Sequence, residues 1–153
     1  MRRGLRPNRA VLTLAAASLL AGCAANAGFN PVGQSSADMS PTQLAAFAAR
    51  AEYPATQPSD GLKAAAIVSR GDGTIKVYNF GDRAIHGAKV WVNRGFVAKV
   101  DGIPPQSHVT IKMDRLFGSF GNTFASQKDT LATLVQLQTD DGGLYTLMGP
   151  VQE

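Results

Sequence analysis

From residue 62 onward, hydrophobic and polar side chains alternate with a period of two, which is typical of half-buried β-strands. The alternation predicts seven strands, at residues 63–69, 74–80, 88–93, 96–100, 108–113, 131–139 and 144–151. Several short strands at this spacing favour an antiparallel sandwich over βαβ units. We therefore expect an all-β fold, a small antiparallel β-sandwich of about seven strands over residues 62–153.

Turn-forming residues set the connections between these strands. Gly71-Asp72-Gly73 and the later run Asp140-Asp141-Gly142-Gly143 consist of residues that tolerate positive φ. Each of the two runs is expected to close an antiparallel hairpin. Pro104-Pro105 predicts a loop, because proline cannot donate a hydrogen bond to a sheet.

A short helix is predicted before the strands, at residues 40–52. Ser40-Pro41-Thr42-Gln43 combines an N-cap serine, a proline at the first helical position and a glutamine three residues after the cap. Leu44 and Phe47 then fall on one face, and Tyr53-Pro54 ends the run. Because an isolated helix of three turns is marginal in water, we expect it to dock on the β-domain through Leu44 and Phe47.

Alternation also assigns the faces of the strands. The side chains predicted to share one interior are Ile75, Val77, Val90, Val92, Val109, Ile111 and Met113. The opposite face carries Tyr78 and Trp91 where a solvated face would be polar. Either the helix covers both aromatics with Leu44 and Phe47, or Tyr78 and Trp91 form an exposed binding face. We expect the covered arrangement, because large aromatics are usually buried by their own chain.

Residues 116–124 place three phenylalanines and two glycines in one loop, at Phe117, Phe120 and Phe124. The loop can plug one end of the sandwich, or it can bind a partner. We expect the plug, because apolar loop residues usually pack inward.

The N-terminus has the layout of a secretory signal. Arginines occupy positions 2, 3, 6 and 9, an apolar run covers residues 10–20, and small residues precede Cys23, which is the only cysteine. The apolar run spans 11 residues. A transmembrane helix needs about 20, so we interpret residues 1–22 as a removable signal peptide.

Leu20-Ala21-Gly22-Cys23 resembles the lipobox of bacterial lipoproteins. The resemblance implies that signal peptidase recognises Leu20, Ala21 and Gly22, and that the thiol of Cys23 receives a diacylglycerol. The alternative is a core cysteine that follows an ordinary signal. Ala24 is not the aspartate that retains many such proteins in the inner membrane, so the resemblance favours a lipid anchor in the outer membrane, facing the periplasm.

Removal of the signal peptide changes the charge of the chain. All four charges in residues 1–22 are arginines, so lysine and arginine fall from 15 to 11, equal to the 11 aspartates and glutamates. The high isoelectric point of the precursor therefore gives no basis for a nucleic-acid partner. Residues 23–39 are rich in Ala, Asn, Gly and Ser and are interpreted as a lipidated flexible tether.

A second resemblance covers residues 79–124. Asn79-Phe80, the run Val90-Trp91-Val92-Asn93, Phe96, and Phe117 with Gly121 and Phe124 resemble a β-module of uncharacterised bacterial envelope lipoproteins. Those proteins carry a glycine where this chain has Pro105-Gln106-Ser107. The resemblance implies a sandwich and no activity.

The sequence offers few residues for catalysis or metal binding. His86 and His108 are the only histidines, whereas a zinc site needs three or four converging donors. Asp72, Asp140 and Asp141 match no calcium loop, and turn formation accounts for them. No nucleophile elbow or phosphate-binding loop is present. We therefore expect no metal, no cofactor and no enzymatic activity.

These patterns lead to two hypotheses about function. The first is a membrane-anchored, non-catalytic module that binds an envelope protein or has a structural role. The second is a module that binds a glycan or a small apolar ligand on the Tyr78 and Trp91 face, which requires an exposed Trp91.

Overall fold

The computed structural model describes residues 36–127 and 130–149. These residues form one α-helix, eight β-strands and two short 3₁₀ helices, η1 (Met113–Arg115) and η2 (Phe124–Ser126). The predicted signal peptide, the lipobox with Cys23, and the tether as far as residue 35 lie outside the described residues, so the structure does not bear on them.

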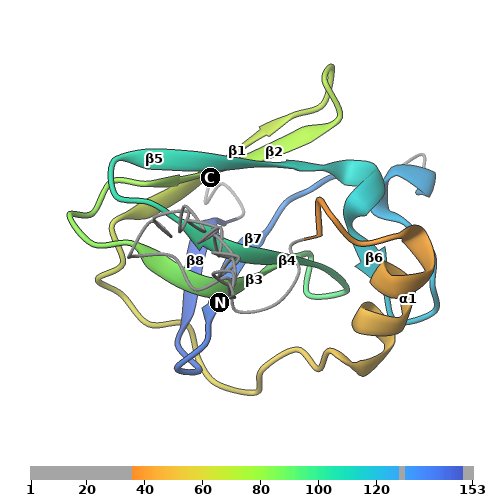
Figure 1. The fold of residues 1–153 in the computed structure, drawn as a ribbon, viewed down its shortest axis with the longest axis horizontal. Coiled ribbons are helices and arrows are strands. Elements are labelled where there is room, and N and C mark those ends of the chain that lie inside the picture. Colours follow the sequence, from red (N-terminus) through yellow and green to blue (C-terminus); the bar gives the residue numbers. More distant parts are fainter. Residues whose placement is uncertain (1–35, 128–129, 150–153) are drawn as a thin grey trace, which may run out of the picture.

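The strands form two antiparallel sheets, which confirms the all-β prediction (Figure 1). The small sheet has the order β1 (Ala64–Ser69), β2 (Thr74–Asn79) and β5 (Ser107–Lys112). The large sheet has the order β6 (Phe117–Gly118), β4 (Phe96–Ile103), β3 (Ile85–Val92), β7 (Val135–Thr139) and β8 (Leu144–Met148).

One hydrophobic core lies between the two sheets. Its buried members from the strands and the residues around them are Ile75, Val77, Ile85, Ala88, Val90, Val92, Ala98, Val100, Ile103, Ile111, Leu116, Phe124, Val135 and Leu137. Val109 and Met113 pack against it and are partly buried. The interior side chains assigned from alternation are therefore correct.

The ends of several strands differ from the prediction. Strand β3 begins earlier than expected, at Ile85, and β6 lies inside the segment that was predicted to be a loop. Strand β7 begins at Val135 rather than at residue 131, because backbone amides just before Val135 hydrogen-bond to the side chain of Asn93. The Asn93 Oδ1 accepts hydrogen bonds from the amides of Thr133 (3.0 Å) and Leu134 (3.1 Å).

Both predicted hairpins are present. Strands β1 and β2 are joined through Gly73, whose φ is +61° and whose amide donates to the Arg70 carbonyl at 3.2 Å. Strands β7 and β8 are joined through Gly142, whose φ is +88°. Glycine adopts this left-handed conformation without steric cost, which explains both positions.

Helix α1 (Pro41–Arg50) has the predicted capping box. The Gln43 amide donates to Ser40 Oγ at 3.3 Å, and the Ser40 amide donates to Gln43 Oε1 at 2.7 Å. These two reciprocal bonds satisfy amides that the first turn would leave unpaired. Leu44 and Ala48 form the buried face of the helix.

The last four residues of the predicted tether, Ser36–Met39, are part of the folded domain; we call them the entry segment. Ser36 is buried, its amide donates to the Lys99 carbonyl at 3.0 Å, and its Oγ accepts from the Lys99 amide at 2.6 Å. Arg115 donates to the carbonyls of Ala37 (2.9 Å) and Met39 (2.7 Å). The predicted boundary at residue 39 is therefore wrong, because distant residues satisfy the backbone of this segment.

Asn79 connects three parts of the chain at one end of the small sheet. Its buried Nδ2 donates to the carbonyls of Arg83 (2.8 Å), Ile103 (3.1 Å) and Pro104 (3.2 Å). Its Oδ1 accepts from the Gly81 amide at 2.9 Å. One side chain thus joins the end of β2 to the connection between β4 and β5.

We predict that Asn79→Asp destabilises the domain by about 3 kcal/mol or more at neutral pH, because a buried carboxylate would face three carbonyl oxygens without a donor. This environment raises the pKa of the new carboxyl in the folded state. The loss of stability is therefore smallest below a pH of about 4, the pKa of the carboxyl in the unfolded chain, where the folded and unfolded states are both protonated. The loss grows as the pH rises above this value. Urea unfolding at several pH values measures both effects.

Asn93→Asp is the matched control, because a carboxylate still accepts from the two backbone amides that bond to the Asn93 Oδ1, and it loses only the exposed bond from Nδ2 to the Leu131 carbonyl (2.6 Å). We expect Asn93→Asp to lower the free energy of unfolding by less than about 1 kcal/mol. Equal losses in the two variants would contradict the role assigned to Asn79.

Candidate interaction surfaces

Helix α1 covers the part of the large sheet that carries Trp91. Trp91 on β3 is 3% exposed and packs with Leu44, Ala48 and Leu144 in a second hydrophobic cluster. The ring of Tyr53 meets the indole edge-on, with 5.4 Å between ring centroids. The covered arrangement is therefore correct for Trp91, and a ligand platform that needs an exposed Trp91 is not formed.

The polar groups under the helix are also satisfied. Trp91 Nε1 donates to Gln138 Oε1 at 3.0 Å. Tyr53 Oη donates to Oε1 of the buried Gln136 at 2.6 Å, and Gln136 Nε2 donates to Thr146 Oγ1 at 3.3 Å. Buried polar groups that are paired in this way fix the packing around Trp91.

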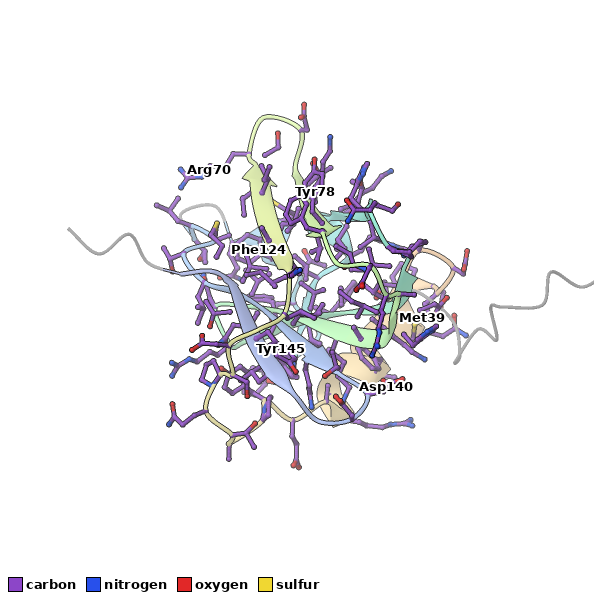
Figure 2. All side chains as sticks on the ribbon, turned by 90° about the vertical axis from the view of Figure 1, so that its left-hand side faces the viewer. Met39, Arg70, Tyr78, Phe124, Asp140 and Tyr145 are labelled. Atoms are coloured by element: carbon purple, nitrogen blue, oxygen red, sulfur yellow. The ribbon has the colours of Figure 1, made fainter. Side chains whose placement is uncertain are left out.

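Tyr78 and Trp91 do not share a face, which corrects the expected arrangement. Tyr78 lies on β2 in the small sheet, whereas Trp91 lies on β3 in the large sheet. Figure 2 places Tyr78 in the upper part of the view, and Asp140 and Tyr145 of the large sheet in the lower part. Leu44 and Phe47 therefore cannot cover both aromatics. Alternation fixes the face of each strand, but it does not say which sheet the strand joins.

The outer face of the small sheet remains open to solvent. We call it the Tyr78 face; its side chains are Ile67, Lys76, Tyr78, Phe80, His108 and Thr110, as the strand register and the alternation of side chains show. Phe80 is 54% exposed and Ile67 is 55% exposed. The rings of Tyr78 and Phe80 are parallel within 3°, with centroids 5.8 Å apart, and the His108 ring lies 5.0 Å from Tyr78.

A free strand edge borders the Tyr78 face. The Met113 amide donates to the Gly73 carbonyl at 2.8 Å, so that the odd-numbered residues of β5 hydrogen-bond to β2. The backbone groups of His108, Thr110 and Lys112 therefore point away from β2. Within residues 36–127 and 130–149, nothing pairs with them.

The two histidines lie in different sheets. His86 is exposed on β3, and His108 is exposed on β5 next to Tyr78. In the part of the chain that the structure describes, no group of three or more histidine, cysteine, aspartate or glutamate side chains could hold a metal ion.

The aspartates that were candidates for metal binding act as turn residues. Asp72 Oδ2 accepts from Ser69 Oγ at 2.7 Å in the first hairpin. In the second hairpin the hydrogen bonds from the Thr139 hydroxyl and the Gly143 amide lower the pKa of Asp141. Each carboxylate is held by its own turn.

The phenylalanine loop divides into an inward and an outward part. Phe117 and Phe124 are buried, as is Leu116, and the Phe124 ring meets Phe96 edge-on at 5.2 Å. The predicted plug is correct for Leu116 and Phe124, which belong to the core between the sheets, whereas Phe117 packs in the second cluster under α1. The plug prediction is wrong for Phe120, which is 97% exposed at the tip of a turn.

The entry segment and its binding site were not predicted. Ser36 lies in a run of small polar residues, and Arg115 follows a strand without any motif, so neither carries a local signal. An open groove of about 420 Å³ lies between this segment and the free edge of β5, and it is lined in part by Lys99, Thr110 and Lys112.

No family model, no curated protein and no solved structure matches this chain. Among the described residues, no helix is long and apolar enough to span a membrane.

The burial of Trp91 predicts its fluorescence. We expect blue-shifted emission that acrylamide quenches weakly, because the indole is enclosed by α1 and Tyr53. Leu44→Ala should shift the emission to the red, since it removes the helix side chain over Trp91, whereas Phe80→Ala should leave it unchanged. Strong quenching in the unsubstituted chain would show that the helix does not cover Trp91.

Proposed function

We propose that the protein is a non-catalytic module of a bacterial envelope, anchored by lipid on Cys23 to the outer membrane and facing the periplasm, which binds a protein partner through the Tyr78 face. One observation carries the proposal. The Tyr78 face is the uncovered outer face of the sandwich, and it combines exposed aromatic and apolar side chains with a free strand edge.

The chemistry of this surface suits a protein partner. Aromatic side chains supply most of the binding energy in protein interfaces, and Tyr78, Phe80 and Ile67 lie together on one face. The outward backbone groups of His108, Thr110 and Lys112 can pair with an extended strand of the partner. Lys112 on the edge strand discourages pairing with a second copy of the same edge.

Binding of a glycan is the second candidate function. The parallel rings of Tyr78 and Phe80 form a flat aromatic surface, and Lys76 and Thr110 supply polar groups beside it. The electron-rich faces of aromatic rings attract polarised C–H groups such as those of a sugar ring. This candidate uses Tyr78 without Trp91, which is buried.

We predict that a photo-crosslinking residue at Ile67, introduced in living cells, gives a discrete protein adduct, because this position lies exposed on the Tyr78 face. The same residue at Asp141, in the exposed turn of the large sheet, should not give that adduct. Adducts that are identical at both positions, or absent at Ile67, would contradict the proposed partner surface.

Thr110→Pro separates the two candidate functions. The Thr110 amide points to the free edge, so proline removes that donor and leaves the pairing of β5 with β2 intact. We expect it to lower the affinity for a protein partner that pairs with the edge by about tenfold, and Thr110→Ala serves as the control. Glycan binding would instead withstand Thr110→Pro and be lost in Tyr78→Ala.

We predict that Cys23→Ser abolishes incorporation of labelled fatty acid into the chain and leaves the signal peptide attached. Metabolic labelling and the mass of the mature protein measure both effects. A serine variant that is still labelled would refute the assignment of Cys23 as the lipid attachment site.

A further inference from the structure

Phe120 stands at the tip of a rigid turn. The Gly121 amide donates to the Gly118 carbonyl at 3.0 Å, and the Gly118 amide donates to the Asn122 carbonyl at 2.8 Å. Ser119 and Phe120 are the two central residues of this turn, which we call the Phe120 tip. A phenylalanine that is 97% exposed on a hydrogen-bonded turn keeps its ring in water at a hydrophobic cost.

The backbone holds the tip in this form. A Cβ atom at Gly118 would lie 2.8 Å from Asn122 Oδ1, and Gly121 has φ +77°. The left-handed conformation at Gly121 favours glycine, and at Gly118 a larger residue would displace the Asn122 side chain. The residues that flank the turn are buried, since Phe117 packs under α1 and Phe124 packs in the main core. The exposure of Phe120 is thus imposed by the fold around it.

The Phe120 tip and the N-terminal segment lie on the same edge of β4. Strand β6, which leads into the tip, pairs with Phe96 and Val97 on β4. The tip continues past the Phe96 end of this pairing, whereas Ser36 bonds to Lys99 on the same edge of β4, about 7 Å beyond Val97 in the other direction. Arg115, just before β6, binds the carbonyls of the entry segment.

The length of chain before Ser36 limits the distance between this edge and a lipid on Cys23. Only 12 residues separate Cys23 from Ser36. A flexible segment of this length has a root-mean-square span of about 20 Å, which is less than the width of the domain. The edge of β4 with the entry segment is therefore the part of the domain that a lipid anchor holds nearest to the bilayer.

We propose that the Phe120 tip inserts into the bilayer that carries the lipid on Cys23, so that the domain is held at two points. The inference rests on the proposed anchor. An aromatic ring at the level of the headgroups has an apolar environment, which removes the cost of its exposure in water. The ring is also preorganised, because the two hydrogen bonds of the turn fix its position before it meets the membrane.

Charge contributes little to this contact. Lys99, Lys112 and Arg115 lie around the entry segment, but Asp38 and Asp114 lie there as well. Arg115 is already bound to two carbonyls. Insertion should therefore depend on Phe120 rather than on anionic lipids, and it should change little with salt concentration.

The test uses the full lipidated chain in vesicles of phosphatidylethanolamine with a minor fraction of phosphatidylglycerol. Phe120→Cys and Pro105→Cys are labelled separately with a nitrobenzoxadiazole dye; lipid occupies the thiol of Cys23. Pro105 is exposed just after the far end of β4, which lies about 25 Å from the end that pairs with β6. We expect phospholipids with nitroxide on the acyl chain to quench the dye at position 120 several-fold more than at position 105.

A second pair of variants tests the phenylalanine itself. The dye is placed at Ser119→Cys, with Phe120 present or changed to serine; both residues lie in the tip, so neither change disturbs the core. Replacement of Phe120 should lower the quenching at position 119 to the level found at position 105. Unchanged quenching would overturn the role of Phe120.

Two other outcomes separate this inference from the anchor. Vesicle-bound protein with equal, weak quenching at positions 120 and 105 overturns the insertion and leaves the anchor standing. A chain that is purified from the cells without lipid on Cys23, and that does not co-sediment with vesicles, refutes the anchor and the inference together.

Discussion

The domain depends on the burial of both faces of its large sheet. The small sheet covers one face through the core around Val90 and Leu137, and α1 covers part of the other through Leu44 and Ala48. A helix of ten residues spans about 15 Å, so it covers Trp91 but not the whole face. Beside the helix the same face carries Lys89, which lines an open pocket with Phe47 of α1, and Lys99 directly opposite it on β4; both are half-exposed. The face thus changes from aromatic to charged residues at the margin of the helix.

The same constraint explains why the free apolar surface is on the small sheet. The chain has one helix among its described residues, and the large sheet uses it. The outer face of the small sheet carries Tyr78 with Phe80 stacked on one side and His108 tilted against it, and none of the described elements covers it. Its edge strand β5 is left with outward backbone groups. The surface proposed to bind a partner is therefore the one for which the described part of the chain has no second helix.

Features that depend on neighbouring residues could be predicted from the sequence, and features that depend on distant pairing could not. The capping box at Ser40, the hairpin at Gly73 and the inward side chains of Ile75 and Val77 follow from local spacing. Strand β2 pairs with β5 and not with the next strand along the chain, and this choice separated Tyr78 from Trp91. No local pattern reports such a choice. The prediction for Phe120 failed for a related reason. The two-residue turn points Phe120 outward, whereas Phe117 and Phe124, which come before and after the turn, are buried.

The attachment of the N-terminal segment links the two proposals. Ser36 and Arg115 fix the chain to the edge of β4, so a lipid anchor before Ser36 would pull on the large sheet and not on the small one. The Phe120 tip extends from β6 on that same edge. A tether alone lets a domain rotate freely, whereas two contacts on one edge restrict its orientation. The Tyr78 face belongs to the other sheet, so neither contact uses its residues. A domain held by the large sheet would thus keep the small sheet available for a partner.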